Sequence, residues 1–509
     1  MGRGLVTFDP GTLSRKERKI LRQVREEHSR SEPVETPEVE ELPFLAIGDR
    51  LRSIGRLNPP PHVGTGWDFA AANPFAASDL PQIVGPVIGL ERLSGGRAFV
   101  MHPWNMYLSG MVSSPNILVK GSLRRGKSYI VKRLVTLLAL FGVYSINTSD
   151  VKGEHGVVAV ALGGQVFKVG SFGTDIRVNP LQAGERHFGE SEEEHMQRML
   201  ASRQQVLQLI GALLAPGSRN LYPAEVAILN WALGEVIRET NDHPTIRKVI
   251  EKIDSSELDT ARGGMFEKSM ARDLVLMFDL LICGNLSGMF EDEGTIQLDP
   301  TSPYTVFDTY AMEKRGDLAL AITQTITNSW VQNMVSNKAS GRRHLIIREE
   351  GWRDMKTKAA LEAHELQLKL SGEYGITMMM IVHEDGDFDT GGEEERNLAQ
   401  KLLRGYANTI TFYQNESTLK RAVEAGTLRQ GEANLIKGFG RGQFMFRAGE
   451  RSYVIDGNPT STAWERELFD TDAAMRQLGR DTDSSTDTNV DSGQPTGQKA
   501  ATPMQGAHV

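Results

Sequence analysis

The stretch NILVKGSLRRGKSYIV, which begins at Asn116, limits the fold of this chain more than any other. An apolar run, a glycine-rich loop and a helical pattern follow one another in it, and Gly121, Gly126, Lys127 and Ser128 match G-x-x-x-x-G-K-S. In such a loop the glycines let backbone N–H groups surround a phosphate, the lysine adds positive charge, and the serine hydroxyl supplies an oxygen to Mg²⁺. The segment therefore predicts a site for ATP and Mg²⁺. The predicted nucleotide contacts are Gly121, Ser122, Leu123, Arg124, Arg125, Gly126, Lys127, Ser128 and Tyr129.

The pattern of strand, loop and helix recurs along much of the chain. VYSINTSD, SPYTVFDT, RHLIIREEGW, GITMMMIVHE and ANTITFYQ contain short apolar runs of strand type, and segments with helical periodicity separate most of them. Buried strands that alternate with helices are typical of a mostly parallel sheet. The alternation stops near residue 191, where helical segments begin and where Ser191 and Glu194 match a capping box. The sequence predicts an α/β fold interrupted by an all-α insertion.

Five regions are predicted from these patterns and from local composition. Residues 1–45 are a basic arm followed by an acidic linker, and residues 46–190 are the first part of the nucleotide-binding domain. Residues 191–290 are the all-α insertion, residues 291–470 are the second part of the nucleotide-binding domain, and residues 471–509 are a polar tail. We expect the tail to be disordered, because so few bulky apolar side chains cannot offset its ordering entropy. The arm is predicted to be solvated, and contact with anionic lipid or nucleic acid is the alternative.

Charge and cysteine content narrow the class of protein. The 509 residues carry a formal net charge of -8, which argues against a globally basic nucleic-acid binder and leaves a local basic channel as an alternative. A single cysteine, Cys283, excludes a disulfide within the chain and fits a reducing cytoplasm. The longest apolar stretch, from Leu134 to Ile146, is shorter than the ~20 residues that span a bilayer. We expect a cytoplasmic protein that reaches a membrane only through partners.

Two consecutive carboxylates are candidates for the chemistry of hydrolysis. Glu349 and Glu350 follow the apolar residues of HLII, so they fall at the C-terminal end of a predicted strand, where ligands bind in open α/β sheets. A P-loop ATPase needs one carboxylate near the metal and one that polarises the attacking water. We assign Glu349 to the Mg²⁺ shell, together with Ser128, and Glu350 to the water. A solvated acidic turn is the alternative, and Arg348 stands where an apolar residue would be usual.

Other polar residues fall at the same predicted edge of the sheet. Asp150 and Glu154 follow the second strand, and a capped helix start explains Asp150 equally well. His383 ends the strand GITMMMIVH, where it is either a sensor of the γ-phosphate or a plain strand-end histidine. Arg441 and Arg447 are candidates for an arginine finger, which in a ring would reach the nucleotide of the neighbouring subunit. We place Arg441 and His383 with the predicted catalytic residues.

The order of these motifs resembles the ATPase family of conjugative type IV secretion systems, the TraC-like branch of the HerA/FtsK superfamily. The resemblance covers residues 85–457 and rests on HPWNMYLSG, GSLRRGKS, SDVKGEH followed by VNPLQ, VFDTYAM and REEGW. REEGW is similar to the Walker B segment of the family, DE-(A/G)-W, which places the two acids on Glu349 and Glu350. The resemblance implies a RecA-like P-loop fold interrupted by a helical domain, ligands ATP and Mg²⁺, and hexamers at the inner membrane.

The chain departs from the family pattern in three respects. Glu349 stands where the family has the Walker B aspartate, and His383 stands where a glutamine is usual after the next strand. We expect the large N-terminal domain of the family to have no counterpart before the core. Inner-membrane secretion components are the expected partners, one of which would dock the ATPase. The predicted function is ATP hydrolysis that energises conjugative DNA transfer or assembly of a type IV secretion channel. A HerA/FtsK-like translocase that acts on DNA or a DNA–protein substrate and a nucleotide-binding scaffold with little hydrolysis are the alternatives.

Overall fold

One β-sheet of eleven strands organises the part of the chain that the structure describes. The computed structural model describes residues 80–469, apart from 172–175, 188, 337–339, 354, 356 and 384–392. The predicted arm and linker at residues 1–45 and the predicted tail at residues 471–509 lie outside the described residues. In chain order the strands are β1 (Val87–Glu91), β2 (Arg97–Val100), β3 (Ile117–Lys120), β4 (Val143–Asp150), β5 (Gln165–Lys168), β6 (Tyr304–Asp308), β7 (Arg343–Glu349), β8 (Ile376–Val382), β9 (Asn408–Thr411), β10 (Gln443–Ala448) and β11 (Arg451–Asp456).

The sheet has a parallel part and an antiparallel part. Its strand order is β2-β1-β11-β10-β9-β3-β8-β7-β4-β6-β5. From β9 to β5 in this order every neighbouring pair is parallel. The strands β10, β11, β1 and β2 continue the sheet in antiparallel pairs. The predicted α/β class with a mostly parallel sheet is therefore confirmed. The sequence patterns did not predict β1, β2 and β5.

Helices cover both faces of the sheet, and the two faces have separate hydrophobic cores. Successive residues of a strand point to opposite faces, so Ile117 and Val119 pack with one core and Leu118 with the other. The first core is covered by α5 and α6, and the second by α12, α13 and α14. These helices and the remaining ones outside the insertion are α4 (Pro103–Leu108), α5 (Lys127–Ala139), α6 (Gly156–Ala161), α11 (Tyr310–Glu313), α12 (Asp317–Val335), α13 (Lys358–Tyr374), α14 (Glu393–Arg404), α15 (Glu416–Glu424), α16 (Gln430–Lys437) and α17 (Ala463–Phe469).

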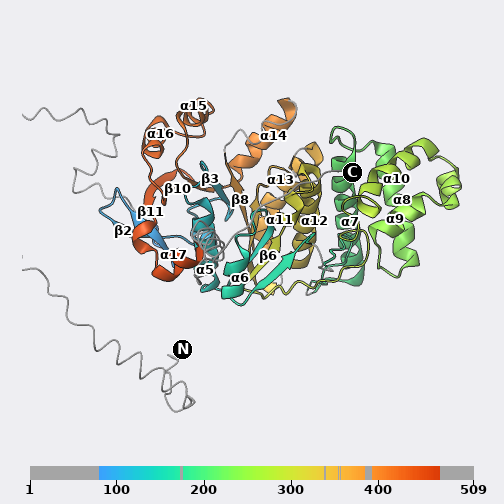
Figure 1. The fold of residues 1–509 in the computed structure, drawn as a ribbon, viewed down its shortest axis with the longest axis horizontal. Helices are drawn as coiled ribbons and strands as arrows, with labels where there is room; N and C mark the ends of the chain where they lie inside the picture. The colour runs from blue at the N-terminus through green and yellow to red at the C-terminus, as the bar shows by residue number, and fades with distance from the viewer. Residues whose placement is uncertain are drawn as a thin grey trace, which may run out of the picture. The chain divides into compact units, whose positions relative to one another are not determined.

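Among the described residues between β5 and β6, four α-helices lie within the stretch for which an all-α insertion is predicted. They are α7 (Glu192–Leu214), α8 (Pro223–Glu239), α9 (Ile246–Ile253) and α10 (Lys268–Ile282). The side chain of Ser191 accepts a hydrogen bond from the backbone of Glu194, whose carboxylate accepts one in return, so a capping box starts α7. Figure 1 shows α7 beside α12, with α8, α9 and α10 on the other side of α7. Their apolar side chains join the core on the α12 face, so the insertion is packed onto the sheet layer.

None of the helices among the described residues combines the length and the apolar character needed to cross a membrane.

Candidate nucleotide-binding site

The glycine-rich loop connects the end of β3 to the start of α5, next to β9. At Gly126 the backbone has φ 109°, in the left-handed region that glycine adopts without strain, and α5 begins at the next residue. A Cβ atom on Gly121 would lie 2.6 Å from Cβ of Phe412, so only glycine fits there. The backbone N–H of Ser122 donates to the carbonyl of Tyr413 at 2.9 Å, which ties the loop to the chain after β9. The loop conformation is therefore fixed by the sheet beside it.

Lys127 lies inside the curve of this loop. Its Nζ atom donates to the carbonyl oxygens of Gly121 and, at 3.2 Å, of Ser122. Nζ also lies 3.1 Å from Nδ1 of His383. Only 7% of the lysine is exposed. The positive charge is thus held at the point where the loop and the end of β8 meet, because β3 and β8 are neighbours in the sheet.

His383 connects Lys127 to the second carboxylate of the predicted Walker B pair. Its Nε2 atom lies 2.7 Å from Oε1 of Glu350, and Oε2 of Glu350 accepts a hydrogen bond from Trp352 at 2.9 Å. An ammonium group can only donate, so Nδ1 of His383 accepts from Lys127 and the Nε2–H group donates to Glu350. The structure thereby brings together three of the predicted catalytic residues, Lys127, His383 and Glu350.

The backbone and the carboxylate of Glu350 are both unusual. Its φ of 52° lies in the left-handed region, which costs a residue with a side chain on the order of 1 kcal/mol. Burial alone would raise the pKa of Glu350, but the hydrogen bonds from His383 and Trp352 outweigh burial and lower the pKa to about 2. Glu350 is therefore ionised at any pH at which a cell works.

Ser128 is paired with a carboxylate that the sequence patterns left open. Its hydroxyl donates to Oε1 of Glu154 at 3.0 Å, and Oε2 of Glu154 forms an ion pair with Lys132 at 3.0 Å. The carboxylate of Asp150 accepts hydrogen bonds from the backbone N–H groups of Glu154 at 3.1 Å and His155 at 2.8 Å. Asp150 therefore holds the turn between β4 and α6 in the form that points Glu154 at α5.

Glu349 lies in a buried cluster that the sequence did not predict. Its Oε1 atom is 2.7 Å from Nε2 of His155, and the hydroxyl of Tyr304 is 2.6 Å from Nδ1 of the same ring. Burial disfavours a charge on His155, but the carboxylates of Glu349 and Asp150 outweigh burial and raise its pKa above the usual value. Burial likewise raises the pKa of Asp150 to about 6. Since the cluster joins β4, β6 and β7, no spacing within the sequence could have indicated it.

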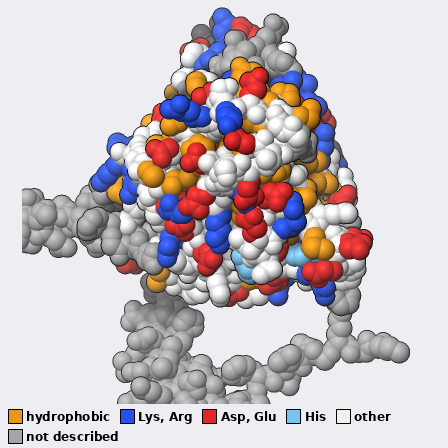
Figure 2. All heavy atoms as spheres, turned by 90° about the vertical axis from the view of Figure 1, so that its right-hand side faces the viewer, with side chains coloured by type: hydrophobic (Ala, Val, Ile, Leu, Met, Phe, Trp, Pro, Cys, Tyr) orange, Lys and Arg blue, Asp and Glu red, His pale blue; other side chains and the backbone are white. Residues whose placement is uncertain are grey.

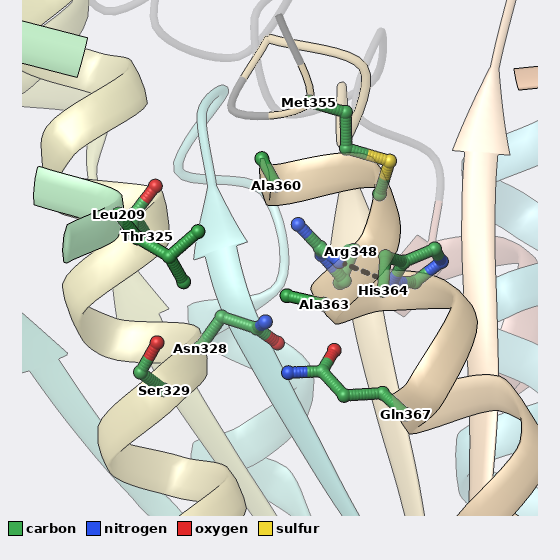
Figure 3. A pocket seen from close by; sticks show the side chains of 10 residues that line it. All are labelled: Leu209, Thr325, Asn328, Ser329, Arg348, Met355, Ala360, Ala363, His364 and Gln367. Atoms are coloured by element: carbon green, nitrogen blue, oxygen red, sulfur yellow. Dashed lines mark hydrogen bonds between the residues drawn. The ribbon is translucent and has the colours of Figure 1, made fainter. Parts of the chain in front are cut away.

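Arg348, which replaces the usual apolar residue, points to the other face of the sheet. Its guanidinium lies 2.7 Å from Nδ1 of His364, and Nε2 of His364 lies 2.7 Å from the hydroxyl of Tyr406. Burial and the charge of Arg348 hold the pKa of His364 well below its usual value, so the ring is neutral. Figure 3 shows this pair at a cavity of about 20 Å³, with Asn328 and Gln367 pointing toward one another from α12 and α13. Arg348 thus links the Walker B strand to α13.

Replacing Arg348 with methionine is expected to destabilise the fold by about 2 kcal/mol and to leave the nucleotide site assembled. The loss arises because Nδ1 of His364 is buried and would lose its donor. Chemical unfolding in urea measures the difference. The double variant Arg348→Met/His364→Leu should recover part of it, since both polar groups are then removed. A stability equal to the wild type in the single variant would show that this hydrogen bond contributes nothing.

Of the remaining predicted residues, Arg441 and Arg125 lie at the loop, and Arg447 does not. The backbone N–H of Gly442 donates to the carbonyl of Arg125 at 3.2 Å, so the exposed Arg441 lies next to the loop of its own chain. The guanidinium of Arg125 stacks 3.9 Å over the ring of Tyr413. Arg447 lies elsewhere, at a cavity of about 600 Å³ beside α14 and α15.

Three other predicted contacts have different surroundings. Leu123 is 65% exposed at the tip of the loop. Arg124 has a φ of 59°, so the loop is in the left-handed region at this residue as well. Tyr129 packs its ring against Phe469 of α17, with 5.4 Å between the ring centres. The main contribution of Tyr129 is therefore to the packing of α5.

Comparison with known proteins identifies the fold. No family model matches the sequence, and no curated protein matches it. The structure of VirB4 from Thermoanaerobacter pseudethanolicus is similar over 76% of this chain and 100% of that chain, with a TM-score of 0.62 and 20% identity. The plasmid coupling protein TrwB in complex with ADPNP is similar over 75% of this chain and 95% of that chain, with a TM-score of 0.46 and 13% identity, too low to support an argument. From the VirB4 likeness, and with a G-x-x-x-x-G-K-S loop between β3 and α5, we conclude that the chain has the α/β fold of the P-loop NTPases.

Proposed function

We propose that the chain is an ATPase that energises conjugative DNA transfer or the assembly of a type IV secretion channel. The observation that carries the proposal is the connection from Lys127 through His383 to Glu350. It joins the residue that would bind phosphate to the residue that would act on water. The motif order that resembles conjugative type IV secretion ATPases and the fold shared with VirB4 support the biological setting.

The donor set suits ATP with Mg²⁺. Mg²⁺ binds oxygen ligands and usually takes only one or two from the protein, with phosphates and water as the others. Ser128 supplies a hydroxyl oxygen, and carboxylates lie on β7 and after β4. From the Walker B pattern, Ser128 and Glu349 would serve the metal. When bound, Mg²⁺ would neutralise the charge that develops on the phosphates.

In the proposed site some residues would bind the phosphates of ATP, and others would orient the attacking water. Lys127 and the backbone N–H groups of the loop would hold the phosphates. Glu350 would orient the attacking water, since a carboxylate with a pKa of about 2 is always ionised but is a weak proton acceptor. The N–H groups of His383 and Trp352 hold its two oxygens and so fix its direction. Arg441 would add positive charge at the γ-phosphate, from its own subunit or from a neighbouring one.

We propose that the active form is a ring, in which Arg441 completes the site of a neighbouring subunit. Arg441→Ala and Lys127→Ala should each abolish turnover alone. Mixing the two variants should restore turnover in part, because some interfaces then pair an intact loop with an intact Arg441. Phosphate release from the mixture measures this. A mixture as inactive as its components would show that Arg441 acts within its own chain, next to Arg125.

The second candidate is a DNA translocase, which would need a positively charged surface to bind the phosphate backbone of DNA. Figure 2 shows the face formed by the insertion, where basic and acidic side chains are interspersed. In the insertion, for example, the exposed Lys268 is paired with Asp259. A mixed surface offers no single-sign field to a phosphate backbone. A strong rise of turnover with duplex DNA that disappears at high salt would nevertheless favour the translocase over the assembly motor.

Peripheral association with the inner membrane through a docking partner is part of the same proposal. The resemblance to membrane-bound secretion ATPases is what supports it. Flotation of the purified chain with vesicles, with and without the membrane fraction of a conjugating cell, separates direct lipid binding from docking on a protein. A nucleotide-binding scaffold is the third candidate, and it predicts tight ATP binding with negligible turnover at every protein concentration.

A further inference from the structure

We infer that Glu154, and not Glu349, is the carboxylate that serves Mg²⁺ in this site, by orienting the hydroxyl of Ser128. The inference rests on the proposed ATP site and deepens it. In this account Glu154 is a positioning residue that acts through Ser128. The Walker B pattern gave this task to Glu349.

The contact between Ser128 and Glu154 leaves the serine ready for a metal. The hydroxyl has one hydrogen, which it donates to Glu154 at 3.0 Å. Its lone pairs are then the part of the group that an ion can use. Lys132, which is 1% exposed, holds the other oxygen of Glu154 at 3.0 Å, so the carboxylate cannot rotate freely. Lys132 lies on α5, as Ser128 does, and Glu154 faces this helix. The direction of the hydroxyl is therefore fixed relative to the loop.

Glu349 is engaged with a different group. Its side chain is 7% exposed and lies 2.7 Å from His155, whose ring is completely buried. The other ring nitrogen of His155, Nδ1, lies 2.6 Å from the hydroxyl of Tyr304, so Glu349 belongs to a buried cluster that is held from β6 as well. Breaking a buried ion pair by withdrawing one partner is strongly destabilising, because the other charge is left buried without compensation. Turning Glu349 toward a metal would have this destabilising effect, whereas Glu154 is already at Ser128.

One residue prepares both arrangements. Asp150 accepts the backbone N–H groups of Glu154 and His155, which follow each other in the turn before α6. Glu154 then points to α5, and His155 points to β6 and β7. The segment SDVKGEH therefore delivers one carboxylate to the loop and one imidazole to the Walker B strand. In this account Glu154, in the turn after β4, takes the task that the Walker B pattern gives to Glu349 at the end of β7.

The test is the dependence of nucleotide affinity on Mg²⁺. ATP with a fluorescent substituent on the ribose is titrated into the full chain, once with Mg²⁺ and once with EDTA. The dissociation constant in EDTA divided by the dissociation constant in Mg²⁺ reports the metal site independently of hydrolysis. Glu154→Gln is expected to lower this ratio about tenfold, as changes behind a metal ligand usually do. The oxygen of the new amide would face Lys132, so its NH₂ group would turn to Ser128 and occupy the lone pairs. Glu349→Gln should leave the ratio within about twofold of the wild type, a change too small to count as loss of a ligand partner.

The outcomes separate the inference from the function beneath it. A ratio that falls in Glu349→Gln and not in Glu154→Gln overturns the inference and leaves the ATPase in place. A wild-type chain that binds the fluorescent ATP in neither buffer overturns the ATP site itself. Glu154→Asp keeps a charge opposite Lys132 and shortens the side chain, so it protects the test against misfolding of the glutamine variant. The aspartate variant should also lower the ratio, and a wild-type ratio in it contradicts the inference. Glu362→Gln removes an exposed carboxylate on α13, outside the site, and is the matched control that should retain the ratio.

Discussion

Replacing Lys127 with alanine is expected to reduce ATP turnover by about 10³-fold, the effect of removing one fixed positive group from a site of developing charge. The lysine is almost completely buried against the loop and contacts two of its carbonyl oxygens. Its loss therefore removes a phosphate ligand and loosens the loop as well. Phosphate release under saturating ATP and Mg²⁺ measures the effect. ATP affinity should fall in the same variant, because the lysine would touch the bound nucleotide and not only the transition state.

The matched control is Lys152→Ala. Lys152 is an exposed lysine in the turn after β4, close in the sequence to Glu154. Its removal changes the net charge by the same amount as Lys127→Ala and should leave turnover within about twofold of the wild type, since exposed charges contribute little. Equal turnover in Lys127→Ala and Lys152→Ala would contradict the proposed site.

Glu350→Gln is expected to retain ATP binding and to hydrolyse ATP about 10² to 10⁴ times more slowly, the range that a positioned acid–base group contributes. The substitution keeps the shape of the side chain. The amide oxygen can still accept from His383, but the amide nitrogen meets the N–H of Trp352, and the negative charge is lost. Equilibrium binding and single-turnover hydrolysis, measured on the same sample, separate the two effects.

Glu362→Gln is the control for this variant. Glu362 is exposed on α13, the helix that follows the Walker B turn, and the change again removes one carboxylate. It should hydrolyse ATP like the wild type. Should Glu350→Gln also hydrolyse at the wild-type rate, the attacking water must be oriented by another group, and the assignment of Glu350 fails.

The lowered pKa of Glu350 also gives the variant a pH signature. A carboxylate whose pKa is lower in the folded state stabilises the fold above its ordinary pKa, and loses this contribution as the pH falls through the folded value. The pKa of Glu350 falls from 4.5 to about 2. The difference in unfolding free energy between the wild type and Glu350→Gln should thus be constant above about pH 4.5 and shrink between pH 4.5 and 2. Urea unfolding at a series of pH values measures it.

The loop could be predicted from the sequence because all of its determinants are local. Gly121, Gly126, Lys127 and Ser128 lie within eight residues, and the apolar run and the helical pattern flank them directly. The acids at the end of β7 were equally visible, because a strand end is a local feature. The strands β1 and β2 were missed because a short strand at the antiparallel end of a sheet has a weak sequence signal. In addition, β11, with which β1 pairs, lies far from it in the sequence.

The partners of the polar residues could not be predicted, since they depend on which strands are neighbours. Asp150 was explained equally well as a helix cap, and only the turn before α6 shows that it positions Glu154 and His155. His155 itself carried no signal, because Glu349 and Tyr304 reach it from strands far along the chain. SDVKGEH places a carboxylate and a histidine side by side just after a strand, and that pattern could have directed attention to both.

Two departures from the usual pattern have structural counterparts. His383 stands where a glutamine is usual, and its two ring nitrogens bridge Lys127 and Glu350. A neutral histidine can accept with one nitrogen and donate with the other, as a glutamine side chain can, so the bridging chemistry is preserved. Arg348 replaces an apolar residue and pairs with His364 on the opposite face of the sheet. Neither substitution removes a group from the predicted site.

The central claim is that ATP is hydrolysed at the loop between β3 and α5, and steady-state phosphate release by the purified chain tests it most directly. Release is measured with Mg²⁺ and saturating ATP over a range of chain concentrations, with Lys127→Ala as the background. Turnover per chain should exceed that background and rise with concentration as neighbouring subunits complete one another's sites. Release equal to the Lys127→Ala background at every concentration would contradict the claim.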